Sequence, residues 1–249
     1  MQSIINYQMS VFGDYSPIEP TLERMNVLAN VPPELGITLI PSTANVISLP
    51  TIANQGDITP PKVIQRISMV DKSQCWNIAV LPERIDVNYF QQRIEEPETF
   101  ANISTRTMSL MKKTINNLDI NYWRMAINFQ MQFDDENDNK ASALFSSLLL
   151  PMRHQIGKES IEWQIMSNCP YEIEIASNQK EVLNVISILA KQFNPVTVWP
   201  VVIAQLDINT SANNGALRFD DDKLDVFYKT AVGIANGFIK DIEEKWKNG

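Results

Sequence analysis

A short string near the N-terminus recurs in the middle of the chain, and this echo constrains the fold more than any other feature. Ile5-Asn6-Tyr7-Gln8-Met9 returns as Ile127-Asn128-Phe129-Gln130-Met131, an offset of 122 positions. Both copies alternate apolar and polar residues, which is the pattern of a half-buried β-strand. We therefore expect two equivalent strands that open two similar halves of the chain.

Two further markers recur at offsets between about 119 and 123 positions. A helix predicted over residues 19–30 stops before Pro32, and a second over residues 139–150 stops before Pro151. A strand end carries Asp86 in the first half, and a similar strand end carries Asp207 in the second. A shared string, helix stop and strand end together predict an internal duplication.

Each half reads as a strand, a helix, four strands and a long closing helix. Apolar residues at steps of three and four predict the closing helices over residues 98–118 and 223–246. Residues 50–61 are predicted to form an exposed loop. Short extended pieces are predicted at residues 37–40 and 46–49, and the other predicted strands cover residues 63–70, 75–80, 84–89, 160–166, 171–176, 181–193 and 196–209.

The sequence thus predicts an α+β fold made of two β-α-β4-α pseudo-repeats, residues 1–118 and 119–249, that form one compact unit. The sheet should be mostly antiparallel and covered on one face by the long helices. This order of elements resembles the duplicated TATA-binding-like and helix-grip folds. A fold does not carry function with it, so the resemblance implies architecture alone.

The C-terminal third carries a second resemblance. Leu206-Asp207-Ile208-Asn209, then Leu217-Arg218-Phe219-Asp220, then Ala235-Asn236-Gly237-Phe238-Ile239 is similar to the ending of a sporadically distributed family of uncharacterised bacterial proteins of about 250 residues. The resemblance implies a bacterial cytoplasmic origin. It implies no reaction and no catalytic residues.

Charge and hydropathy exclude several classes of function. The formal net charge is −8 and the basic residues are scattered, whereas a nucleic-acid-binding protein clusters cations against phosphates. No apolar run approaches the ~18 residues that a spanning helix needs. The N-terminus lacks the basic and apolar regions of a signal peptide, so we expect a cytoplasmic protein without nucleic-acid or membrane partners.

The sequence predicts no cofactor and no metal site. Cys75, Cys169 and the single histidine, His154, are too few for a closed zinc site. An EF-hand loop beginning at Asp134 would need glycine and glutamate where Asn139 and Phe145 stand. Only eight glycines occur, and none forms a phosphate-binding motif.

Asp86 and Asp207 are the candidate catalytic residues, because they occupy matched places in the two halves. If the fold brought them together, the two carboxylates would share a proton or bind a cation, as paired acids do in hydrolases. The alternative is that each accepts hydrogen bonds from its own neighbourhood, and the repeated role is structural.

Aromatic and methionine residues on the predicted strands are candidates for partner binding, namely Trp163, Met131 and Trp199. We therefore predict a non-enzymatic protein that binds a protein partner or its own copies through an apolar sheet face or a strand edge. The alternative is a small-ligand-binding protein or a hydrolase that uses the paired carboxylates where the halves meet.

Overall fold

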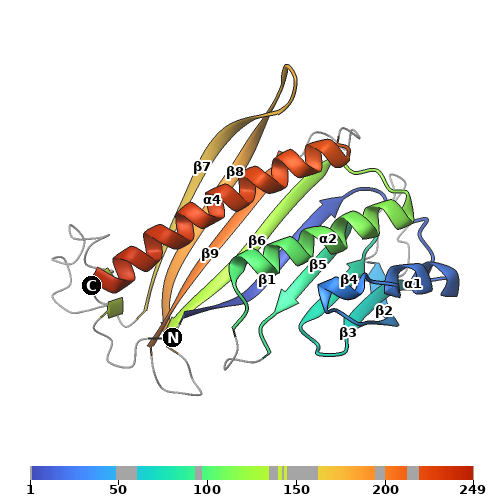
Figure 1. The fold of residues 1–249 in the computed structure, drawn as a ribbon, viewed down its shortest axis with the longest axis horizontal. Helices are drawn as coiled ribbons and strands as arrows, with labels where there is room; N and C mark the ends of the chain where they lie inside the picture. Colours follow the sequence, from blue (N-terminus) through green and yellow to red (C-terminus); the bar gives the residue numbers. More distant parts are fainter. Residues whose placement is uncertain are drawn as a thin grey trace.

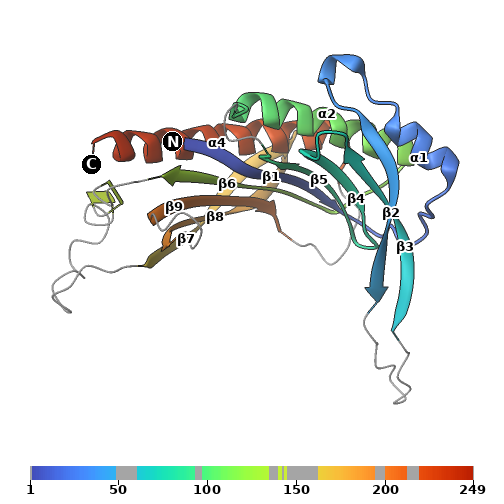
Figure 2. The same ribbon diagram turned by 90° about the horizontal axis from the view of Figure 1, so that it is seen from below.

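The computed structural model describes residues 2–48, 61–92, 97–134, 140–141, 143–144, 162–193, 200–211 and 219–248. Within them, three α-helices lie on one face of a single large sheet (Figures 1 and 2). The elements, in chain order, are β1 (Gln2–Phe12), α1 (Leu22–Ala29), η1 (Pro33–Leu35), β2 (Leu39–Ser48), β3 (Lys62–Asp71), β4 (Trp76–Val80), β5 (Arg84–Phe90), α2 (Phe100–Leu118), β6 (Arg124–Asp134), β7 (Trp163–Ala176), β8 (Gln179–Phe193), β9 (Pro200–Thr210) and α4 (Asp221–Asn248).

The sheet confirms the predicted α+β class and the predicted antiparallel arrangement. Its nine strands follow the order β2-β3-β4-β5-β1-β6-β9-β8-β7, and every neighbouring pair is antiparallel. The two echo strands, β1 and β6, lie side by side at the centre. The strands of the first half therefore extend to one side of this pair, and those of the second half extend to the other.

The centre of the core is the residue pair at the middle of the echo. Tyr7 lies directly opposite Phe129, both side chains are fully buried, and their ring centroids are 6.4 Å apart. Phe100 of α2 packs against both rings, and Phe238 of α4 contacts Phe129. Aromatic pairs at these distances stabilise a core beyond the apolar area they bury. The two long helices thus meet over the junction between β1 and β6.

Side-chain caps set where the long helices begin. The Thr99 hydroxyl accepts a hydrogen bond from the Asn102 amide at 3.3 Å, and α2 starts at the next residue. The Asp220 carboxylate accepts one from the Lys223 amide at 3.0 Å, and this contact lowers the pKa of Asp220. A carboxylate therefore caps the last helix, where negative charge interacts favourably with the positive helix end.

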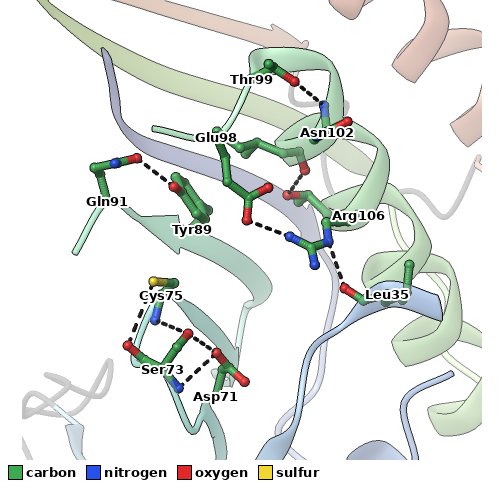
Figure 3. Close-up of polar contacts among 12 residues, drawn as sticks. Leu35, Asp71, Ser73, Cys75, Tyr89, Gln91, Glu98, Thr99, Asn102 and Arg106 are labelled. Atoms are coloured by element: carbon green, nitrogen blue, oxygen red, sulfur yellow. Dashed lines mark hydrogen bonds and ion pairs between the residues drawn. The ribbon is translucent and has the colours of Figure 1, made fainter. Parts of the chain in front are cut away.

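The basic residues of α2 contact neighbouring elements. Arg106 donates to the Leu35 carbonyl at 2.7 Å and to the Glu98 carboxylate at 2.6 Å (Figure 3). Its guanidinium also lies over the Trp76 ring. Lys112 pairs with Asp225 of α4 at 2.6 Å, and Lys113 donates to the Asn30 carbonyl. These cations fasten α2 to its neighbours in both halves of the chain.

The strand count of the second half differs from the prediction. Residues 163–176 form the single strand β7, which passes through Pro170, where two short strands were expected. The described residues between β6 and α4 therefore contain three strands and not four. In the first half, the pieces expected at 37–40 and 46–49 likewise belong to one strand, β2. Most of the predicted loop at 50–61 and most of the predicted helix at 139–150 lie outside the described residues.

Candidate functional site

The face of the sheet without helices is polar at its centre. Side chains alternate along each strand, so residues between the buried positions of β1, β6 and β9 point to this uncovered face. Asn6 donates to Gln130 at 3.3 Å, and Gln130 donates to Gln205 at 2.9 Å, which forms a carboxamide chain across three strands. An apolar sheet face was expected, and the central strands correct that expectation.

Asp86 lies on the uncovered face, because its neighbours Ile85 and Val87 point into the core. Its side chain is nevertheless buried. It accepts a hydrogen bond from the Ser10 hydroxyl at 2.6 Å and pairs with the Arg84 guanidinium at 3.0 Å. Burial raises the pKa of Asp86, while Ser10 and Arg84 act in the opposite direction. The carboxylate therefore has local partners that account for its place in the structure.

Asp207 does not meet Asp86. Asp86 lies opposite Ser10 on β1, and Asp207 lies opposite Asn128 on β6, so two strands separate them. Three strand spacings correspond to about 14 Å across the sheet. Two cavities lie in the described structure, one beside Asp14 and Trp123 and one beside Ser3 and Met131, and neither aspartate lines them. The predicted pair of catalytic carboxylates is therefore wrong.

The ladders also show that the two aspartates are not equivalent positions. When Tyr7 is aligned with Phe129, Asn6 is equivalent to Asn128. The residue opposite Asn6 on β5 is then equivalent to the residue opposite Asn128 on β9. These partners are Phe90 and Asp207. Asp207 therefore corresponds to Phe90, four residues beyond Asp86. An offset along the chain cannot reveal such a change of strand register.

Two of the predicted partner-binding residues belong to the core. Met131 is 1% exposed and Trp163 is 9% exposed, and the pleat points both side chains toward the helices. They stabilise the packing and are not available to a partner, which corrects the prediction for these two positions. Trp199 lies outside the described residues.

The exposed feature that the sequence analysis missed is the outer edge of the sheet at β7. Residues 163–171 contain no charged side chain, and Glu162 and Glu172 flank this run. Residues 166–172 are all exposed, with Met166 at 66% and Tyr171 at 49%. β7 is the last strand in the sheet order, so one of its sides has no partner among the described strands. In Figure 1 the turn between β7 and β8 lies well beyond α4.

An apolar patch adjoins this edge on the uncovered face. Met166 lies directly opposite Ile188, and Ile186 is two residues further along β8 on the same face. Both isoleucines are half-buried. We name Met166, Ile186 and Ile188 the edge patch. The uncharged run in a chain with 20% charged residues was the available sequence signal for this site.

Other kinds of site find no support within the described part of the chain. No group of three or more His, Cys, Asp or Glu side chains there is arranged to hold a metal ion. Among the described helices, none has both the length and the apolar character that crossing a bilayer requires.

Comparisons with known proteins add little to this geometry. The sequence matches no protein-family model and no curated protein. One solved structure, the di-domain ARO/CYC StfQ from the steffimycin biosynthetic pathway, is similar over 98% of this chain and 97% of its own. The two chains are 7% identical and superpose with a TM-score of 0.24, a level at which no property of StfQ is carried over.

Proposed function

We propose that this chain is a non-enzymatic binding protein that pairs the free edge of β7 with a strand of another polypeptide, either a partner protein or a second copy of itself. The observation that carries the proposal is the exposed, uncharged β7 edge. An edge strand presents unpaired N–H and C=O groups, which an added strand can satisfy.

Natural proteins usually guard such edges with charged side chains, especially lysine, or with a short strand. β7 is 14 residues long, and its exposed residues 166–171 carry no such charge. Pro170 interrupts the edge at one position, because proline has no N–H to donate. The remaining residues of the run keep both donors and acceptors, which suits the strand for pairing.

The edge patch supplies side-chain contacts next to the main-chain ladder. In strand addition, backbone hydrogen bonds give affinity, and pockets for alternate side chains give specificity. Met166 and the two isoleucines provide an apolar surface for those side chains, and methionine adapts readily to different partners. The carboxamides nearer the sheet centre would border this contact with polar groups.

We further infer that residues 1–118 and 119–249 derive from two copies of one unit. The support is the central pairing of Tyr7 with Phe129, together with the strand order, which runs β5-β1 on one side of the junction and β6-β9 on the other. The second copy then lacks a counterpart of β2 among its described strands. β7 is therefore the outermost described strand of the second copy, whereas the first copy continues beyond β3 with β2.

A lysine placed in the edge patch tests the proposed contact. Met166→Lys adds a charge that an associated β7 would bury, so it should weaken association about tenfold or more. Ile40→Lys, on the opposite edge strand β2, is the matched control because Ile40 is also exposed. Light scattering over a range of concentrations measures self-association. Co-purification from the native host measures binding to other proteins.

The proposal predicts that wild type and Ile40→Lys associate alike and that Met166→Lys loses the self-associated or co-purified species. Retention of the same species by Met166→Lys would contradict it. The proposal would also be contradicted if the wild-type chain stayed monomeric and co-purified with no protein whose binding is lost in Met166→Lys.

A further inference from the structure

The uncovered face of the sheet carries two adjacent rows of carboxamide side chains at its centre, where a row is a set of residues directly opposite one another on neighbouring strands. Gln8 of β1 lies opposite Asn128 of β6, and Asn6 lies opposite Gln130 in the next row. Gln130 also lies opposite Gln205 of β9. These side chains are half-buried, and both long helices lie on the other face (Figure 2). We name Asn6, Gln8, Asn128, Gln130 and Gln205 the carboxamide patch.

Strand propensity does not account for this composition. Asparagine is depleted in β-strands, because β-branched residues such as threonine fit the pleated surface better. The row of Gln8 nevertheless continues with Asn88 of β5 and Asn77 of β4. Residues that strands disfavour, gathered on one face of neighbouring strands, point to a role beyond folding.

Gln8 and Asn128 keep their hydrogen-bonding groups free at the centre of the patch. The carboxamides beside them are occupied with one another, since Asn6 donates to Gln130 and Gln130 donates to Gln205. Within the described residues, no hydrogen bond joins the side chain of Gln8 or Asn128 to another protein group. Side chains directly opposite each other on antiparallel strands have Cβ atoms about 4.5–5.5 Å apart. The two amide groups can therefore contact the same ligand.

The patch is uncharged, although the whole chain carries a net charge of −8. Asp207 lies opposite Asn128 and would repel a polyanion, and its carboxylate already accepts a hydrogen bond from Asn209. Arg84 and Arg124 occupy the same face two rows away. Arg84 pairs with an aspartate of its own strand, and Arg124 donates to an asparagine of β9. These surroundings favour a polar ligand without charge.

The hydroxyl groups of a carbohydrate match carboxamides in hydrogen bonding. A hydroxyl carries one donor and two acceptor lone pairs, and a carboxamide carries two donors and an acceptor oxygen. Neighbouring hydroxyls of one sugar can therefore donate to and accept from the amides of Gln8 and Asn128 at once. An extended peptide would instead direct its side chains toward the sheet face, so its N–H and C=O groups would not reach the patch. The patch therefore suits a carbohydrate better than a peptide.

Phe90 supplies an apolar surface at the end of the patch. It lies directly opposite Asn6, and its side chain is 43% exposed. The face of an aromatic ring carries a partial negative charge, which attracts the C–H groups of a sugar ring. The row from Phe90 through Asn6 and Gln130 to Gln205 crosses β5, β1, β6 and β9, a span of about 14 Å. This span accommodates a short chain of sugars.

We propose that the carboxamide patch binds a neutral carbohydrate chain. Gln8 and Asn128 exchange hydrogen bonds with the hydroxyls of one sugar, and Phe90 packs against the ring of another. The carboxamides of the neighbouring row contact the hydroxyls between them. No residue of the patch belongs to β7, so the proposal goes beyond the strand-pairing function and does not depend on it.

Nitrogen-15 NMR tests this site, because the side-chain NH2 groups of Gln8 and Asn128 give signals of their own. Gln8→Ala and Asn128→Ala each remove one of these signals and so assign it. The probes are cellohexaose, maltohexaose, xylohexaose and mannohexaose, and acetyl-hexaserine amide is an uncharged peptide that also carries hydroxyls. At least one sugar chain should shift both signals saturably, with a Kd below about 1 mM at low and at high salt, and the peptide should shift neither.

The double variant Q8A/N128A should weaken this binding about fivefold or more, as calorimetry would measure. The matched control is N45A/Q65A, which removes an asparagine and a glutamine that are directly opposite each other on β2 and β3, outside the patch, and should leave the affinity unchanged. Backbone amide signals of the core strands report whether each variant remains folded. The proposal is overturned if none of the four sugar chains shifts the signals, if the peptide shifts them equally, if binding disappears at high salt, or if Q8A/N128A loses no more affinity than N45A/Q65A.

Discussion

The two ends of the sheet differ in how their outer strands are covered. β2 and β7 both lack charged residues, β2 over its whole length and β7 over residues 163–171. Each contains one proline, Pro41 or Pro170, that interrupts the row of donors. α1 packs against β2 and β3, and Leu39 at the start of β2 is only 4% exposed. Beyond Leu39, residues 40–47 of β2 are exposed or half-buried, with Ile40 at 52% and Ile47 at 63%, and the middle of β7 is exposed likewise.

An exposed, uncharged edge is therefore common to β2 and β7 and is not by itself a docking site. α4 contacts β7, but only Trp163, Ile173 and Ile175 are buried there. The residues between Trp163 and Ile173 remain accessible on both faces of the strand, apart from the half-buried Ile165. The strands differ in their buried anchor residues, Leu39 in β2 and three residues in β7, and substitutions at buried and at exposed positions should separate packing from recognition.

The largest expected effect is on stability at the covered end. Leu39→Ala removes a buried side chain and leaves a cavity, so the free energy of unfolding should fall by about 2–4 kcal/mol. Met166→Ala removes a side chain that is 66% exposed, so the change should stay within about 0.5 kcal/mol. Urea unfolding measures both values from the midpoint at constant slope.

This comparison requires a protein concentration low enough to exclude association, since a bound copy would itself stabilise the fold. Equal losses in the two variants would show that β7 is packed as firmly as β2. The proposed docking edge would then lose its main support.

The sequence predicted the elements well, because alternation and helical periodicity are local properties. β6 alternates without interruption from Met125 to Phe133, and the predicted strand matches it closely. The failures came around Pro170 and Pro41, where separate pieces were predicted and the structure has one continuous strand. An outermost strand tolerates proline because one of its sides has no ladder, and only the sheet order reveals which strands are outermost.

The candidate site was harder to predict, because it depends on register and cover. Asp86 and Asp207 follow similar strings, yet their ladders place them at different levels of the sheet. Met131 has the same side-chain chemistry as Met166, but helices cover the first and nothing described covers the second. Neither distinction is contained in local sequence patterns.

A smaller effect is expected at Asp86, the buried carboxylate on the first-half side of the junction. Asp86→Asn should cost about 1 kcal/mol near pH 3.5, because the new amide group faces Arg84. The pKa of folded Asp86 lies above its ordinary 3.8, so the folded state holds the proton more tightly than the unfolded chain. Wild-type stability therefore falls as pH rises from 3.8 through the folded pKa, and the variant lacks this loss.

Chemical unfolding at several pH values measures the difference, which should move in favour of Asp86→Asn as the pH rises. Ser10→Ala removes a hydrogen bond that lowers the pKa, so it should steepen the wild-type dependence. A difference that stays constant from pH 3.5 to pH 7 would refute the assigned cause.

The ion pair between the two long helices should contribute still less. Lys112 of α2 and Asp225 of α4 are 2.6 Å apart, but their side chains are 35% and 38% exposed, so solvent screens the attraction. Lys112→Ala should lower the free energy of unfolding by about 0.5 kcal/mol, with a smaller loss at high salt. A loss that does not respond to salt would indicate that the aliphatic stem of Lys112 matters more than its charge.

The two cysteines allow a test of the comparison without any change in stability. Cys169 is exposed on β7, whereas Cys75 is half-buried just before β4 and donates a weak hydrogen bond to the Ser73 carbonyl. Iodoacetamide should therefore modify Cys169 several-fold faster than Cys75 in the folded protein, as mass spectrometry of timed samples would show. If β7 pairs with a second copy, a higher protein concentration should slow the reaction at Cys169 and leave Cys75 unaffected. Met166→Lys should remove this protection, and protection that survives the substitution would place the contact elsewhere.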